Sequence, residues 1–149
     1  MQNSPPVFLL LLTLAGVLGL VALIAGFRLR PVAPSRGITL IAVLPALAML
    51  GLFYSLAIHM HQSLGGWPTS TGESGFPSPL ITHADIATSC FANLLLVSMF
   101  AWPIAVALCA FVRRWRGGIF YLGVYALSCL ICFGGMLLAP SGFLYWWWD

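Results

Sequence analysis

Long apolar stretches alternate with short polar segments along the chain. Four of these stretches reach the ~20 residues that an α-helix needs to cross the hydrocarbon of a bilayer. We therefore predict four transmembrane helices, over residues 6–27, 38–60, 85–112 and 119–139. Residues 61–84 then form an outer loop, and the tail 140–149 carries tryptophans that are typical of the membrane interface. The fold class that this pattern predicts is an all-α integral membrane protein, an antiparallel bundle of four transmembrane helices.

Prolines and turn-forming residues add detail to these elements. Pro45 and Pro103 lie inside the second and third predicted helices, where each removes a backbone hydrogen bond and favours a kink. The connector 61–81 is rich in Gly, Pro, Ser and Thr, which are typical of turns. Trp67 and Phe76 within it can anchor at the membrane interface, so we expect this loop to cap the bundle.

Small residues recur on one face of the first predicted helix. Ala15, Gly19, Ala22 and Gly26 are three or four residues apart and therefore share a helical stripe. Such a stripe lets another helix approach closely. We expect it to pack within the bundle, with self-association as the alternative.

The composition indicates a membrane protein rather than a soluble one. Of 149 residues, 61% are hydrophobic and 6% are charged, whereas about 25% are charged in a soluble domain. Four spans in a chain of this length predict a single domain, 1–149, without a separate catalytic module. The sequence shows no phosphate-binding glycine loop, no Ser-His-Asp or Cys-His nucleophile arrangement and no pair of catalytic carboxylates. These features favour a protein that is not an enzyme and leave the question open.

The basic residues predict how the chain is oriented. All six are arginines in two short segments, Arg28, Arg30 and Arg36 in one and Arg113, Arg114 and Arg116 in the other. The positive-inside rule places both segments in the cytoplasm and both termini outside, in the plasma (inner) membrane. All three histidines then face outward. The net charge of +3 comes from these arginines, which flank the predicted spans, so we predict a lipid bilayer as partner and no nucleic acid.

Polar chemistry gathers between residues 59 and 85. This stretch holds all three histidines and two of the three acidic residues. Imidazole and carboxylate ligands suit zinc, copper, nickel or iron. The helical rise from each arginine segment places His59 and His83 at a similar depth, so these two form the core of a candidate site. The candidate metal ligands are His59, His61, His83, Asp85 and Glu73.

Two alternatives stay open for the same residues. Polar side chains also gather at helix ends because water is there, and Thr82 with Asp85 has the spacing of a capping box. A haem held between His59 and His83 is the other alternative, because facing helices of a bundle can supply an axial histidine pair. The sequence has no C-x-x-C-H haem-attachment motif. The cofactor therefore stays unknown, a transition metal or haem.

Weaker polar signals lie within the predicted spans. Asp85, Ser89 and Asn93 recur every fourth residue, and we expect Ser89 and Asn93 to make hydrogen bonds between helices rather than to line an ion path. Cys129 and Cys132 form a C-x-x-C within an apolar span, where a thiol behaves as a small apolar group. We predict a packing role for this cysteine pair.

Two classes of function follow from these observations. The first is a small polytopic membrane protein of structural or accessory type, a homo-oligomer or a subunit or partner of a larger membrane complex. The stripe of small residues and the scarcity of polar groups in the spans favour it. The alternative is an outward-facing metal- or haem-binding membrane protein for redox or metal handling, with His59 and His83 at its centre.

Overall fold

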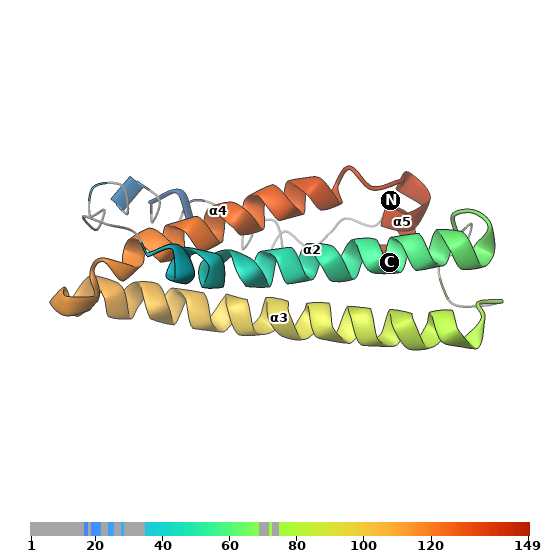
Figure 1. The fold of residues 1–149 in the computed structure, drawn as a ribbon, viewed down its shortest axis with the longest axis horizontal. Helices are drawn as coiled ribbons and strands as arrows, with labels where there is room; N and C mark the ends of the chain where they lie inside the picture. The colour runs from blue at the N-terminus through green and yellow to red at the C-terminus, as the bar shows by residue number, and fades with distance from the viewer. Residues whose placement is uncertain are drawn as a thin grey trace. The chain divides into compact units, whose positions relative to one another are not determined.

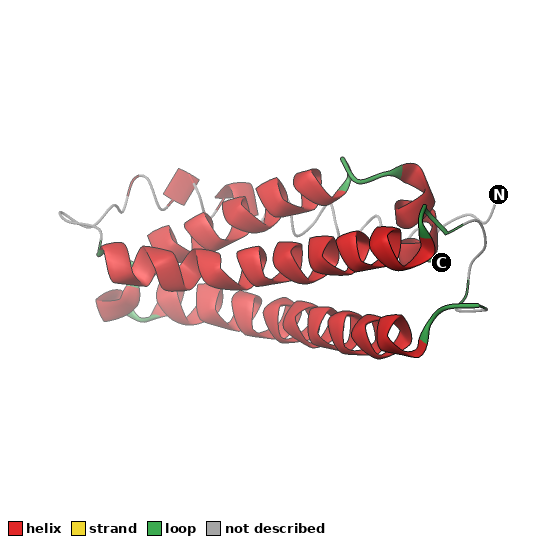
Figure 2. Cartoon of the chain, turned by 45° about the vertical axis from the view of Figure 1, so that its right-hand side comes forward, coloured by secondary structure: helices red, strands yellow, loops and turns green. Residues whose placement is uncertain are grey.

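The computed structural model describes residues 17, 19–21, 24–25, 28, 35–68, 72 and 75–149. Over these residues the chain is helical and contains no strand (Figure 2). Three of the elements are long α-helices, and the other two are a short 3₁₀ turn and a short terminal helix (Figure 1). Their bounds are α2 (Arg36–Leu64), α3 (Ser78–Phe111), η1 (Arg113–Trp115), α4 (Gly118–Met136) and α5 (Ser141–Trp148).

Three of the helices, α2, α3 and α4, are long and apolar enough to cross a membrane. The prediction of an all-helical membrane protein is therefore confirmed at the level of these helices. The first predicted span, 6–27, lies largely outside the described residues, and so do Ala15, Ala22 and Gly26 of its small-residue stripe. Gly19, which is described, lies close to α4, because a Cβ added to it would stand 3.2 Å from the Ala126 Cβ.

The helix ends differ from the predicted ones in ways that local chemistry explains. Helix α3 begins at Ser78 rather than near residue 85, because proline is tolerated in a first helical turn, and Pro79 occupies that place. Thr82 thus lies inside the helix and donates its hydroxyl to the Ser78 carbonyl at 3.1 Å, so the predicted capping box with Asp85 is wrong. Residues 141–148 of the tail form helix α5 directly after Pro140.

The described chain divides into two compact units. One comprises residues 45–98 and 131–149, and the other comprises residues 1–44 and 99–130. In the first unit an aromatic cluster forms the core. Phe53 of α2 is fully buried, and its ring lies 4.9 Å from that of Phe143 and 5.0 Å from that of Trp147, both of α5.

Helix α5 is held in this unit by close contacts with the connector. A Cβ on Gly142 would lie only 2.9 Å from the Trp67 Cβ, so the small residue permits this approach. The Trp146 indole donates to the Gly72 carbonyl at 3.3 Å, and its ring lies 6.0 Å from that of Phe76. The two predicted anchors of the connector, Trp67 and Phe76, therefore pack on the core cluster and on α5.

Hydrogen bonds tie the second unit together. The Ser35 amide donates to the Tyr121 hydroxyl at 2.8 Å, and the Trp102 indole donates to the Leu122 carbonyl at 3.2 Å, which links α3 to α4. Every arginine that the structure describes here is exposed, namely Arg28, Arg36, Arg113, Arg114 and Arg116.

Replacing Phe53 by alanine should test the aromatic core. We expect Phe53→Ala to lower the free energy of unfolding by about 3 kcal/mol or more, because the lost ring leaves a cavity among Phe143 and Trp147. Reversible unfolding in mixed detergent micelles measures the change. The matched control is Ile58→Ala on the same helix, whose side chain is 56% exposed and should cost less than about 1 kcal/mol. Equal losses in the two variants would contradict the core assignment.

Candidate functional site at His59 and His83

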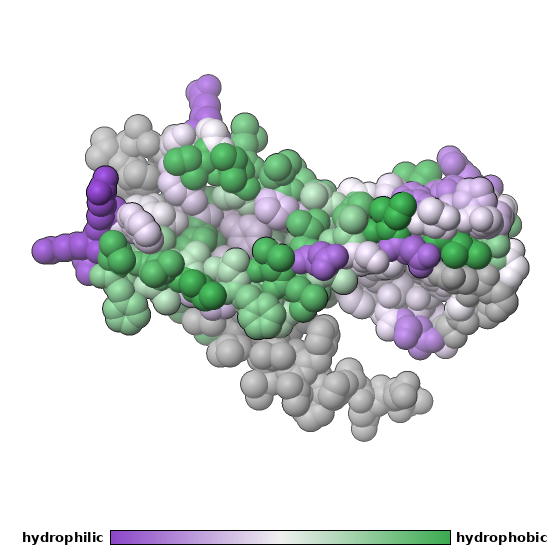
Figure 3. All heavy atoms as spheres, turned by 90° about the horizontal axis from the view of Figure 1, so that it is seen from below, coloured by the Kyte–Doolittle hydropathy of each residue, from purple (hydrophilic) through white to green (hydrophobic). Residues whose placement is uncertain are grey.

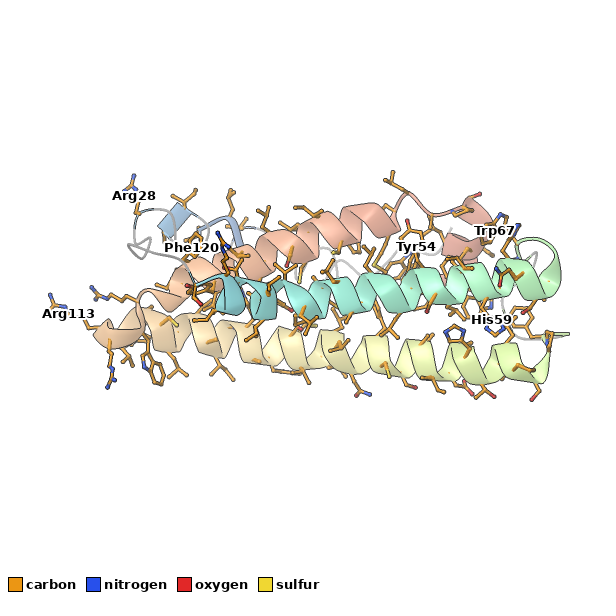
Figure 4. All side chains as sticks on the ribbon, in the orientation of Figure 1. Arg28, Tyr54, His59, Trp67, Arg113 and Phe120 are labelled. Carbon is orange, nitrogen blue, oxygen red and sulfur yellow. The ribbon has the colours of Figure 1, made fainter. Side chains whose placement is uncertain are left out.

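Two histidines from different helices meet in the first unit. His59 near the end of α2 and His83 near the start of α3 are both half-buried. Their Nδ1 atoms lie 2.8 Å apart, and their ring centroids lie 5.0 Å apart with a tilt of 33°. Figure 4 shows the labelled His59 side chain between the two helices. This is hydrogen-bond distance, so one of the two nitrogens carries a proton and the other accepts it.

Small and apolar neighbours bring the two rings together. On α3, Ala84 and Ala87 are buried, and their small side chains let α2 approach closely. On α2, Leu56 and Met60 are fully buried on either side of His59 in the sequence. The histidines thus stand at the border of a packed helix contact, where each is half-buried.

A third side chain determines which nitrogen carries the proton. The Ser55 hydroxyl donates its only proton to the Leu52 carbonyl at 2.9 Å. Ser55 Oγ must therefore accept at its 3.3 Å contact with His83 Nε2, so that nitrogen bears hydrogen. In neutral His83 the Nδ1 is then an acceptor, and His59 Nδ1 is the donor. The result is one directed chain, from His59 through His83 and Ser55 to the Leu52 carbonyl.

This chain leaves one chemically available atom. In the neutral pair, His59 Nε2 keeps a lone pair, and it has no hydrogen-bond partner among the residues that the structure describes. A proton or a metal ion can attach there without breaking any link of the chain. A ligand at His83 Nδ1, by contrast, would have to displace the hydrogen bond between the two rings.

The other predicted ligands lie apart from this pair. His61 is exposed, and its ring stacks on Trp67 at 4.5 Å and 28°. Asp85 is exposed, and Glu73 lies outside the described residues. Within the described ranges no group of three or more His, Cys, Asp and Glu side chains is placed to hold a metal ion. The structure thus brings together two of the five proposed ligands, and the full metal set stays a prediction.

The distance between the two Nδ1 atoms also bears on whether a haem fits between the histidines. Two imidazoles that ligate one haem iron stand on opposite faces of the porphyrin, with their nitrogens about 4 Å apart, twice a typical metal–imidazole bond. His59 and His83 are directly hydrogen-bonded at 2.8 Å, which leaves no room for a porphyrin between them. The arrangement described here does not fit a bis-histidine haem.

Sequence patterns indicate part of this site and miss part of it. Ser55 and His59 are four residues apart, which places them on one helical face, but the role of Ser55 as the acceptor for His83 depends on side-chain directions that spacing does not define. On α3, Ser89 and Asn93 are exposed, and neither has a side-chain hydrogen bond to the other described residues.

No family model, curated protein or solved structure matches this chain. Its function is therefore inferred from the chemistry and geometry of its own residues.

The directed hydrogen-bond chain can be tested by nitrogen-15 NMR of labelled protein in nanodiscs. At a pH where the pair is neutral, we expect the Nδ1–H tautomer for His59 and the Nε2–H tautomer for His83, because Ser55 can only accept. Ser55→Ala should release the preference of His83 and leave the signals of His61, which stacks on Trp67, unchanged. Finding the Nε2–H tautomer at both His59 and His83 would disprove the chain.

Proposed function

We propose that this chain is a small polytopic membrane protein of structural or accessory type that works as a subunit of a larger assembly in the bilayer. The observation that carries the proposal is the surface of α3 that the described residues leave uncovered. Its buried residues, Leu80, Ala84 and Ala87, all lie near its start. None of the most apolar 18-residue window of α3 is buried, compared with 28% in α2 and 22% in α4.

Polar groups on this surface favour a protein neighbour over lipid. Ser89 and Asn93 are exposed on a helix apolar enough to cross a membrane, and Figure 3 shows hydrophilic groups among apolar side chains on the side where α3 lies. Lipid chains offer no hydrogen-bond partner, and an unpaired amide in hydrocarbon costs several kcal/mol. A partner helix that supplies donors and acceptors removes this cost.

The proposed topology has four spans, with residues 6–27 as the first. Both arginine segments then lie in the cytoplasm, and the His59–His83 pair lies toward the outer surface of the plasma (inner) membrane. Support comes from the exposure of the described arginines, which are free to meet water and anionic headgroups on one side of the bilayer.

Photocrosslinking in intact cells should separate a protein neighbour from lipid. A photoreactive residue at Leu96 of α3 is expected to yield adducts with protein, whereas the same residue at Leu47 of α2 should react mainly with lipid. The two sites form a matched pair, because Leu96 is 51% exposed and Leu47 is 52% exposed. Lipid adducts alone at both sites would contradict the accessory role.

A second candidate function, metal handling at the outer surface, is favoured by the His59–His83 contact. Two imidazoles that bind one tetrahedral metal ion at about 2.0 Å have nitrogens about 3.3 Å apart, close to the observed 2.8 Å. Transfer of the His59 proton from Nδ1 to Nε2 and a small separation of the rings would admit the ion between two neutral imidazoles. The remaining ligands would come from solvent, from the metal's carrier, or from the other candidates His61, Asp85 and Glu73.

Metal analysis of the purified protein tests this second candidate. We expect wild-type protein loaded with zinc or copper to retain a stoichiometric ion, and His59→Ala and His83→Ala each to lose it. His61→Ala should only weaken binding, since the His61 ring stacks on Trp67 rather than facing the pair. Stoichiometric metal that persists in both alanine variants of the pair would refute the assignment.

A further inference from the structure

One line of exposed residues on α3 has the spacing of the contact line in a helix pair. Five residues, hereafter the α3 seam, follow one another at alternating intervals of four and three. They are Thr82, Ile86, Ser89, Asn93 and Leu96, and all five are exposed. This is the spacing of the a and d positions of a heptad, which keeps one line of side chains facing a partner helix.

The α3 seam lies opposite the face by which α3 packs in its own unit. At 100° per residue, the buried Leu80, Ala84 and Ala87 project more than 90° away from Asn93 around the helix. Phe91, which packs against Trp147 with ring centroids 5.2 Å apart, projects to the same side as they do. One face of α3 is thus occupied by its own chain, and the other carries the repeat.

We infer that a second copy of this chain covers the α3 seam, as a parallel α3–α3 pair around a two-fold axis. This deepens the proposed accessory function and rests on it. All copies insert into the membrane in the same direction, so two α3 helices run parallel and their Asn93 side chains stand at the same depth. A carboxamide has both donors and an acceptor, so two Asn93 side chains satisfy each other across the axis.

Self-complementarity is what favours a second copy over an unrelated helix. An unrelated partner needs a polar group at the depth of Asn93 and another one turn away at Ser89. A second copy has both by construction, because a two-fold interface presents the same patch from each side. Asn93 falls at an a position of the repeat, and a buried asparagine there specifies register and oligomeric state in paired helices.

Energy transfer between differently labelled copies tests whether Asn93 stabilises the α3–α3 pair. The copies are reconstituted in liposomes at a series of protein-to-lipid ratios. We expect Asn93→Leu to weaken association about tenfold through the loss of the shared hydrogen bonds. Asn93→Gln should retain most of the association, because it keeps the amide. Thr88→Val is the matched control on the same helix, since Thr88 is exposed but bonds to its own backbone at Ala84 and lies outside the α3 seam. Unchanged association of Asn93→Leu would overturn the inference.

Disulfide crosslinking tests the geometry of the α3–α3 pair. The background is a variant in which the four native cysteines are replaced by alanine, and energy transfer first checks that this variant still associates. Ser89→Cys should form an intermolecular disulfide far faster than Thr88→Cys, one residue away, and give a band at twice the mass of the chain. Equal rates would overturn the α3 pair. Protein adducts from Leu96 without any Ser89→Cys dimer would reject the second copy and leave the accessory role standing, whereas lipid adducts alone would reject both.

Discussion

Hydrocarbon offers no hydrogen-bond partner, and this constraint governs where polar groups can lie in a chain whose described part holds three helices able to span a membrane. Backbone groups meet it through the helices themselves. Side chains meet it by short local bonds, as Thr88 does with the Ala84 carbonyl at 2.7 Å and Ser128 does with the Tyr125 carbonyl at 2.7 Å. Others bond between helices, as the Trp102 indole does with the Leu122 carbonyl at 3.2 Å. Two groups of residues carry a functional proposal. One is the histidine pair, and the other is the α3 seam.

The histidine pair satisfies the constraint by pairing across helices. His59, His83 and Ser55 form one directed chain that ends on the Leu52 carbonyl, so the contact between α2 and α3 has a polar link at its edge as well as an apolar core. The proton shared between the two Nδ1 atoms is part of this helix contact. A metal ion that takes its place between the rings therefore acts on the packing of α2 against α3.

The elements of the fold follow from the sequence pattern more closely than the details of the site do. Apolar runs of span length predict α2, α3 and α4, because helix formation in a bilayer is imposed by backbone chemistry and depends little on neighbours. The start of α3 at Ser78 is missed, and the predicted start is residue 85. Pro79 lies in the first turn of the helix, but the sequence alone does not distinguish such a proline from one that lies outside a helix. The helical form of the tail and its contacts are also missed, because the sequence pattern does not indicate that Phe143 and Trp147 pack on Phe53.

At the site, the helical rise suffices to place His59 and His83 at one depth, but spacing alone does not indicate their neighbours. The stacking of His61 on Trp67 depends on the path of the connector, and the role of Ser55 depends on a rotamer. The exposure of Asn93 is likewise a property of the packed unit. Its position four residues from Ser89 is visible in the sequence, but only the structure shows that no described helix covers it.

What covers α3 decides between an isolated membrane protein and a subunit. Single-molecule photobleaching counts how many copies associate in the bilayer. Each chain carries one fluorophore, and the protein density in the liposomes is lowered in steps. We expect most spots to bleach in two steps at moderate density and to shift toward one step on dilution. Single-step bleaching at every density would contradict the α3 pair.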